Sequence, residues 1–310
     1  MASDLGGLPV FEDREDRPLR ADAAASPNGP GALLESVRPP AYGRGVSISI
    51  AAAGAVFALA IMASGGQAEV TGIPMTQTTG ALFWGLAILA VVATGIGAQY
   101  VEITAARAAE SLGQPRRATS LPTAWTVPAA AVGAAVLLVA TYHNRTMLAA
   151  GPVIAFLGVA GGLIARDLLE DTIEGTERTA ALIHSVLIHL VAFLALSAIY
   201  MNKLSPWWGA PLVAVFTIVL IVEALERGKL PDPQKVLYAA ISAGVMVLAL
   251  LIVNWWPTYG WTGGAALLLC FFVLAGLLTT RAQGGTIRDR DVIEFGLVFL
   301  VGLIVIAVTL

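Results

Sequence analysis

The sequence predicts an all-α fold: a polytopic transmembrane helical bundle of about nine spans, with the N-terminus inside the cell and the C-terminus outside. Of the 310 residues, 57% are hydrophobic and only 13% are charged, and the mean hydropathy is +0.79. A soluble domain carries about 25% charged residues, so this chain needs lipid as its solvent. Two further observations support the fold class. The apolar residues fall in runs of membrane-spanning length, and lysine and arginine are distributed one-sidedly between these runs.

Composition divides the chain into two domains. Residues 1–45 are rich in Pro, Gly, Ala, Asp and Arg and show no hydrophobic period, which predicts a disordered cytoplasmic tail. This stretch has no apolar core of a cleavable signal peptide, so the first apolar run is expected to act as a signal anchor. Residues 46–310 form the predicted transmembrane helical domain.

Nine apolar segments follow, each close to the ~20 residues that cross a ~30 Å hydrocarbon core. They are helices because open strands would leave backbone groups unpaired in lipid, and runs such as AALLLCFFVLAGLL lack the alternation of a barrel strand. Only residues 143–146 separate the third segment from the fourth. The predicted spans are 46–64, 80–101, 124–142, 147–165, 180–200, 207–225, 236–256, 262–280 and 291–310.

Basic residues orient this series. With the N-terminus inside, only Arg145 and Lys203 of the 18 lysines and arginines fall in outer segments. Such an excess on one side is the positive-inside pattern, and adding or removing one span would destroy it. Six of the seven tryptophans lie at the predicted outer ends, as an aromatic belt at that interface, and only Trp125 marks the inner one.

Two histidines lie within the fifth span. His184 and His189 are five residues apart, which turns them about 140° from each other on a helix, so they do not share a face as the histidines of a zinc motif do. A functional interpretation makes them a proton relay or a cofactor contact. The alternative is a neutral imidazole bonded to a neighbouring helix.

Acidic residues gather at the predicted inner helix ends. Glu102, Glu223 and Glu294 are the ones most flanked by apolar residues, and each has an arginine nearby in sequence: Arg107, Arg227 and Arg290. One hypothesis is a cytoplasm-facing polar vestibule that binds a cation or a polar headgroup. The other is a set of ion pairs at the boundary between membrane and water. Together with His184 and His189, these three acids form the candidate polar site.

Small residues and prolines complete the pattern. Gly158 and Gly162 form a GxxxG motif, which allows close helix contact. Pro128, Pro152 and Pro211 are expected in the first turn of their helices, where a missing N–H costs nothing. The sequence therefore predicts no broken helix of the kind that forms binding sites in many transporters.

Three functions remain open. The first is a permease-like protein that handles a small or amphipathic solute or lipid, and the second is a non-catalytic structural or assembly subunit of a larger membrane complex. The third is a membrane-embedded lipid-modifying enzyme, although the sequence assigns no catalytic residue and an enzyme is the less favoured class. No metal site is expected, and the sequence identifies no cofactor. The composition is typical of a bacterial inner-membrane protein.

The expected partners follow from the same composition. They are the lipid bilayer and, in addition, other membrane subunits or a second copy of the chain. Nucleic acid is not expected as a partner.

Overall fold

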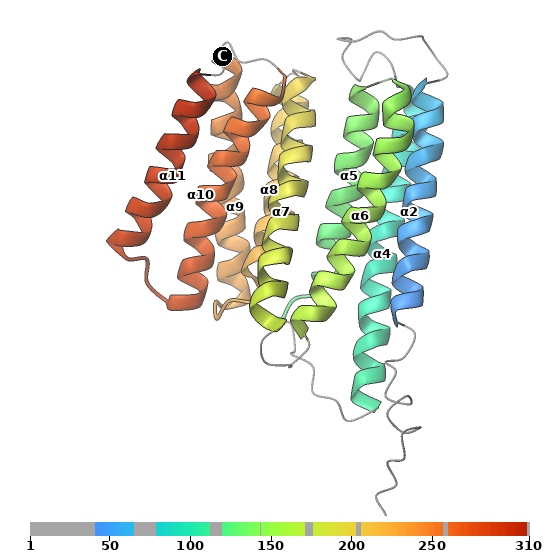
Figure 1. The fold of residues 1–310 in the computed structure, drawn as a ribbon, viewed down its shortest axis with the longest axis horizontal. Helices are drawn as coiled ribbons and strands as arrows, with labels where there is room; N and C mark the ends of the chain where they lie inside the picture. The colour runs from blue at the N-terminus through green and yellow to red at the C-terminus, as the bar shows by residue number, and fades with distance from the viewer. Residues whose placement is uncertain are drawn as a thin grey trace, which may run out of the picture. The chain divides into compact units, whose positions relative to one another are not determined.

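The computed structural model of the protein describes residues 41–64, 79–111, 120–142, 144–170, 176–202, 206–256 and 260–308. Within these ranges the chain forms nine α-helices and no strand (Figure 1). The predicted all-α polytopic bundle is therefore confirmed. The first helix begins at Ala41, inside the stretch predicted as a tail, and residues 1–40 lie outside the described residues.

Each helix corresponds to one predicted span. Eight helices are long and apolar enough to cross a membrane, which makes this a multi-pass membrane protein. The ninth, α5, has only 16 residues and is about 24 Å long at 1.5 Å per residue. The helices are α2 (Ala41–Ser64), α4 (Ala81–Ser111), α5 (Thr126–Thr141), α6 (Arg145–Glu170), α7 (Thr176–Met201), α8 (Pro206–Glu226), α9 (Asp232–Trp255), α10 (Trp261–Gly284) and α11 (Asp289–Val308).

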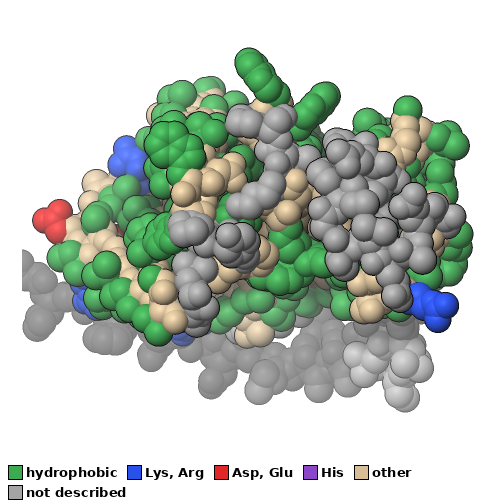
Figure 2. All heavy atoms as spheres, turned by 90° about the horizontal axis from the view of Figure 1, so that it is seen from above, with side chains coloured by type: hydrophobic (Ala, Val, Ile, Leu, Met, Phe, Trp, Pro, Cys, Tyr) green, Lys and Arg blue, Asp and Glu red, His purple; other side chains and the backbone are tan. Residues whose placement is uncertain are grey.

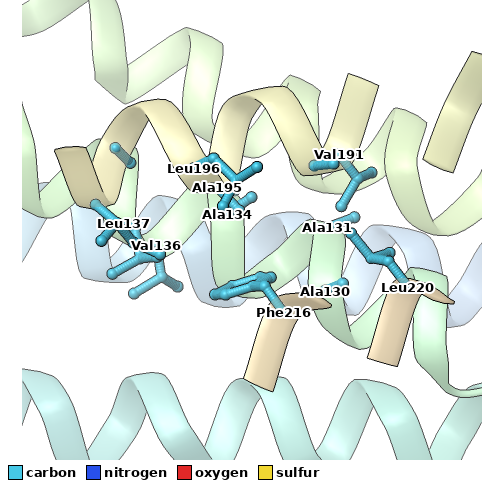
Figure 3. Close-up of a cluster of buried hydrophobic side chains, with 14 of the residues drawn as sticks. Ala130, Ala131, Ala134, Val136, Leu137, Val191, Ala195, Leu196, Phe216 and Leu220 are labelled. Carbon is cyan, nitrogen blue, oxygen red and sulfur yellow. The ribbon is translucent and has the colours of Figure 1, made fainter. Parts of the chain in front are cut away.

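The short helix α5 is the centre of the packing. It contacts α2, α4, α6, α7 and α8, and almost all of its side chains are buried. Its Ala and Val residues pack against Val191 and Leu196 of α7 and against Phe216 and Leu220 of α8 (Figure 3). Small side chains let these helices approach α5 closely, so the most Ala-rich span becomes the core helix.

Helices that are consecutive in sequence run in opposite directions, so the bundle has two ends. We call the end at which α4, α6, α8 and α10 finish the inner end, because the basic residues predict that it faces the cytoplasm (Figure 1). Large apolar side chains cover the sides of the helices, for example Leu82, Ile252 and Ile293, each more than 60% exposed. Lipid can solvate such a surface and water cannot. At the opposite end, hydrophobic side chains predominate over charged ones on the visible face (Figure 2).

The prolines differ from expectation at two of three positions. Pro128 lies in the first turn of α5 as predicted, whereas Pro152 and Pro211 lie inside α6 and α8. Both helices continue through them, because an interior proline in a membrane helix is tolerated when neighbouring helices supply the packing. The expectation that these two residues begin their helices was wrong.

The GxxxG motif packs inside the bundle. A methyl group on Gly158 would collide with Cβ of Ala131 on α5, and one on Gly162 would lie 3.2 Å from Val127. The motif thus brings α6 onto the core helix. The backbones of α7 and α10 approach more closely than those of α5 and α6: a methyl group on Gly264 would lie 2.6 Å from the Ser197 Cα atom, whereas one on Gly158 would lie 3.7 Å from the Ala131 Cα atom.

Candidate functional site

A buried polar cluster lies near the inner end, centred on Glu223 in the last turn of α8. The Glu223 side chain is 2% exposed. Thr126 Oγ1 donates a hydrogen bond of 2.9 Å to Oε2, and Arg166 Nη1 lies 3.3 Å from both carboxylate oxygens. His184 Nε2 lies 3.2 Å from Oε1. Arg166 Nη1 also donates to Thr123 Oγ1 at 3.0 Å. We call these five residues the Glu223 cluster.

The direction of each helix explains why these side chains meet. Arg166 lies one turn before the end of α6, and Glu223 lies in the last turn of α8, since both helices run towards the inner end. Helix α7 starts from that end, so His184 reaches the same level in its third turn. All three side chains point inward: Arg166 is 3% exposed and His184 is 5% exposed. Four separate elements therefore contribute to one site.

The backbone that leads into α5 is the fourth element. Residues 120–125 are not part of the helix, yet Thr123 and Ala124 in this stretch are buried. Thr126 begins the helix and its side chain faces Glu223, so the carboxylate lies at the positively polarised N-terminus of α5. Irregular backbone at membrane depth is tolerated where protein buries it. The predicted span 124–142 thus begins as a helix two residues later than expected, and no helix is broken among the described residues.

A second carboxylate flanks the cluster. The Oε2 atom of Glu102 on α4 lies 3.9 Å from Arg166 Nε, and the Glu102 side chain is 18% exposed. Arg166 is therefore held between two carboxylates from different helices. One of these, Glu223, is buried, and the other is partly open. A guanidinium, an imidazole and two carboxylates together can redistribute charge when a proton enters or leaves.

A further network lies beside the Glu223 cluster, on the same turn of α8. Lys235 on α9 is 2% exposed, and its Nζ donates to Glu226 Oε2 at 3.0 Å and to Ser120 Oγ at 2.6 Å. It also lies 3.2 Å from Asp232 Oδ1. Glu226 Oε1 accepts hydrogen bonds from the backbone amides of Ser120 and Leu121, at 2.6 and 2.9 Å. We call this the Lys235 network; it ties the non-helical segment to α8 and α9.

Three of the five candidate residues come together in the structure. Glu102, Glu223 and His184 all contact the Glu223 cluster or belong to it. The partners of Glu223 are Arg166 and His184 from other helices, and the carboxylate is buried inside the bundle rather than at the boundary with water. These contacts join three of the candidate residues across helices, and whether they form a vestibule that binds a cation or a polar headgroup stays a prediction.

The other two candidates lie elsewhere. His189 Nδ1 is 2.7 Å from the Ser185 carbonyl oxygen, and its ring contacts Phe271 and Phe272 of α10. Glu294 is exposed and forms the expected pair with Arg290 of its own helix, at 2.7 Å. The orientation of the two histidines away from each other is confirmed. A single site that includes all five residues is not what the structure contains.

From the sequence, Arg166 and Lys235 were predicted only to be among the basic residues of the inner segments. Both are buried and central to their networks, and Thr123, Thr126 and Glu226 were not singled out either. For Arg166 the sequence did contain an indication of burial. It follows an apolar run and precedes an acidic residue directly, as expected for an arginine within the end of a membrane helix. Among the described residues, no group of three or more His, Cys, Asp or Glu side chains is arranged to hold a metal ion.

Comparison with known proteins gives a family but no relative of known activity. No curated protein and no solved structure matches the chain. A family model matches residues 49–309, which covers all nine helices except the first turns of α2. The chain belongs to the family described as Protein of unknown function (DUF5656).

Proposed function

We propose that this protein is a permease that moves a small or amphipathic solute across the bacterial inner membrane, and that proton exchange at the Glu223 cluster drives the movement. The observation that carries this proposal is the convergence of Glu223, Arg166 and His184 from three helices into a buried site. Ionisable side chains within membrane spans are costly and mark ion pathways and proton relays.

Stability alone is a poor explanation for such a cluster. A buried ion pair repays its desolvation cost only with excellent geometry, and well-packed apolar residues of similar volume are often as stabilising. The distances from Arg166 Nη1 to the two Glu223 oxygens are 3.3 Å each, longer than the 2.7–2.9 Å of a strong charged hydrogen bond. Stabilisation of the fold therefore does not by itself account for the cluster, and we propose a role in proton exchange for it.

The proton step follows from the contacts. His184 Nε2 lies 3.2 Å from the Glu223 carboxylate, and a positioned imidazolium ring can pass a proton to such a group. After His184 has taken up a proton from water to become an imidazolium, transfer of its Nε2 proton to Oε1 leaves a neutral carboxylic acid and a neutral imidazole. Arg166 then loses its buried counter-charge and is attracted towards Glu102, whose Oε2 lies 3.9 Å away on the more open side. Protonation thereby changes the contacts between α4, α6 and α8.

The test uses the full-length protein in proteoliposomes that enclose a pH-sensitive dye. A pH gradient is imposed, and potassium chloride, ethidium bromide, sodium lactate and alanine are added separately as solutes of different charge. We expect at least one of them to cause a protein-dependent change of internal pH. Glu223→Gln should abolish this change, because the amide takes up no proton.

Glu294→Gln is the matched control. It makes the same chemical change in an exposed carboxylate outside the cluster and should retain the wild-type rate. The proposal fails if the wild-type protein leaves the internal pH unchanged with all four solutes, or if Glu223→Gln is as active as the wild type.

One observation favours the second candidate, a non-catalytic subunit of a membrane complex. Helix α11 packs on α10 and has no buried residue, so most of its apolar surface is available to lipid or to another membrane protein. Purification of the native protein in a mild detergent separates the two candidates. A stoichiometric partner lost when α11 is deleted, together with absent proton movement, would favour the subunit.

A further inference from the structure

The Glu223 carboxylate occupies a position that is built for an anion. Two side chains on different elements donate to it, the Arg166 guanidinium and the Thr126 hydroxyl, and the His184 imidazole of a third element lies 3.2 Å away. The N-terminus of α5 adds the partial positive charge of its first turn. Positively polarised helix ends that begin inside a membrane protein are a common means of holding an anionic group of a substrate.

His184 supplies a second, independent indication of a ligand. It is 5% exposed, and both of its ring nitrogens are buried without a hydrogen-bond partner among the described residues, although Nε2 lies 3.2 Å from Glu223 Oε1. A buried polar atom without a partner is costly, so it persists where a ligand or a second state of the site satisfies it. One of the two unsatisfied atoms, Nε2, faces the position that the Glu223 carboxylate occupies.

From these contacts we propose that the solute carries a carboxylate, which takes the place of the Glu223 carboxylate on Arg166, Thr126 and His184. The proposal rests on the permease function given above and names its substrate class. In the state described here, Glu223 acts as an internal substitute for the solute and keeps the site closed. When Glu223 leaves, the exposed side of the cluster near Glu102 is the route by which a carboxylate reaches Arg166.

Competition from the Glu223 carboxylate sets the expected affinity for an external carboxylate. If Glu223 occupies the anion position for more than nine-tenths of the time, the apparent affinity for an external carboxylate is reduced at least about tenfold. Glu223→Gln removes the competing charge and leaves Arg166 in need of an anion. The variant should therefore bind a carboxylate at least about tenfold more tightly than the wild type.

The experiment measures thermal stabilisation of the full-length protein in lipid nanodiscs at constant ionic strength. Acetate is titrated against acetamide and methylammonium, the neutral and cationic molecules of similar size. Decanoate is titrated against decanol, which distinguishes a membrane-dissolved carboxylate from a water-soluble one. We expect acetate or decanoate, but none of the controls, to stabilise the wild-type protein weakly and Glu223→Gln at a concentration at least about ten times lower.

Glu223→Asp covers the case in which Glu223→Gln does not fold. Aspartate keeps the charge but withdraws the carboxylate by one methylene, so it competes less well, and carboxylate binding should be tighter than in the wild type. Equal stabilisation by acetate and acetamide, or no gain in carboxylate affinity in either folded variant, overturns the proposal. Proton movement driven by potassium or ethidium without any carboxylate binding would overturn the substrate class and leave the permease function standing.

Discussion

Removal of the buried Lys235 charge should lower the free energy of unfolding by an amount that its contacts allow us to estimate. Its ammonium group donates to Glu226 and Ser120 and lies close to Asp232, and the side chains of Lys235 and Glu226 are each 2% exposed. Lys235→Met keeps most of the apolar stem and deletes the charge. The Glu226 carboxylate then stays buried without its cation.

The magnitude follows from the remaining partners of Glu226. Breaking a buried ion pair by removing one member costs about 3–5 kcal/mol in the free energy of unfolding. Glu226 still accepts hydrogen bonds from the Ser120 and Leu121 amides, so we expect the lower end of that range, about 3 kcal/mol. The double variant Lys235→Met/Glu226→Gln removes both charges and should be at least about 1 kcal/mol more stable than Lys235→Met alone.

The assay is reversible unfolding in mixed detergent and sodium dodecyl sulfate micelles, followed by tryptophan fluorescence. Arg290→Ala is the control, because it breaks an ion pair whose two side chains are 85% and 59% exposed, and it should not change the unfolding midpoint measurably. The reasoning is refuted if Lys235→Met is as stable as Arg290→Ala. It is also refuted if the double variant loses as much as the two single variants added together.

Three further predictions follow from the same contacts. His184→Gln should abolish proton movement in proteoliposomes, whereas His189→Gln should retain it, because only His184 contacts Glu223; equal rates would contradict the separation of the two histidines. Gly264→Val should lower the free energy of unfolding by about 2 kcal/mol or more, because the valine side chain meets the Ser197 backbone. Gly244→Ala is the control: its methyl group enters open space, so thermal unfolding should show a neutral or slightly stabilising effect. A reporter enzyme that is active only outside the cytoplasm should be active when fused after Leu310, and activity of a cytoplasmic reporter there would break the predicted orientation.

The number and type of helices could be predicted because they depend on local composition. Every span needs about 20 apolar residues, and that requirement is visible in one sequence. The start of α5 could not be predicted, because Ala124 and Trp125 are as apolar as the helix that follows them. Only the packing around residues 120–125 shows that the helix begins at Thr126.

The candidate site was predictable in part. Glu102, Glu223 and His184 stood out because each is an ionisable residue with apolar neighbours. Arg166 did not stand out, since a basic residue near an inner helix end is expected as an anchor whether it faces the headgroups or the interior. The rotation of α6 about its own axis decides whether Arg166 faces the headgroups or the interior. That rotation depends on the fit of Gly158 and Gly162 against α5.

His189 and Glu294 show the opposite error. Both are ionisable residues with apolar neighbours in sequence, as Glu223 is. However, His189 on α7 contacts the phenylalanines of α10, and Glu294 on α11 is exposed. Tertiary packing separates residues that look equivalent in sequence.

The central claim is that the Glu223 cluster works as a site and does not merely support the fold. The most direct measurement is the proton flux per folded molecule for the wild type, Glu223→Gln and Glu294→Gln, with the folded fraction of each reconstituted sample determined in parallel. If the cluster is a functional site, Glu223→Gln loses its flux while a large folded fraction remains, and Glu294→Gln keeps the wild-type value. A flux that falls only in proportion to the folded fraction would contradict it and would make the cluster a structural element.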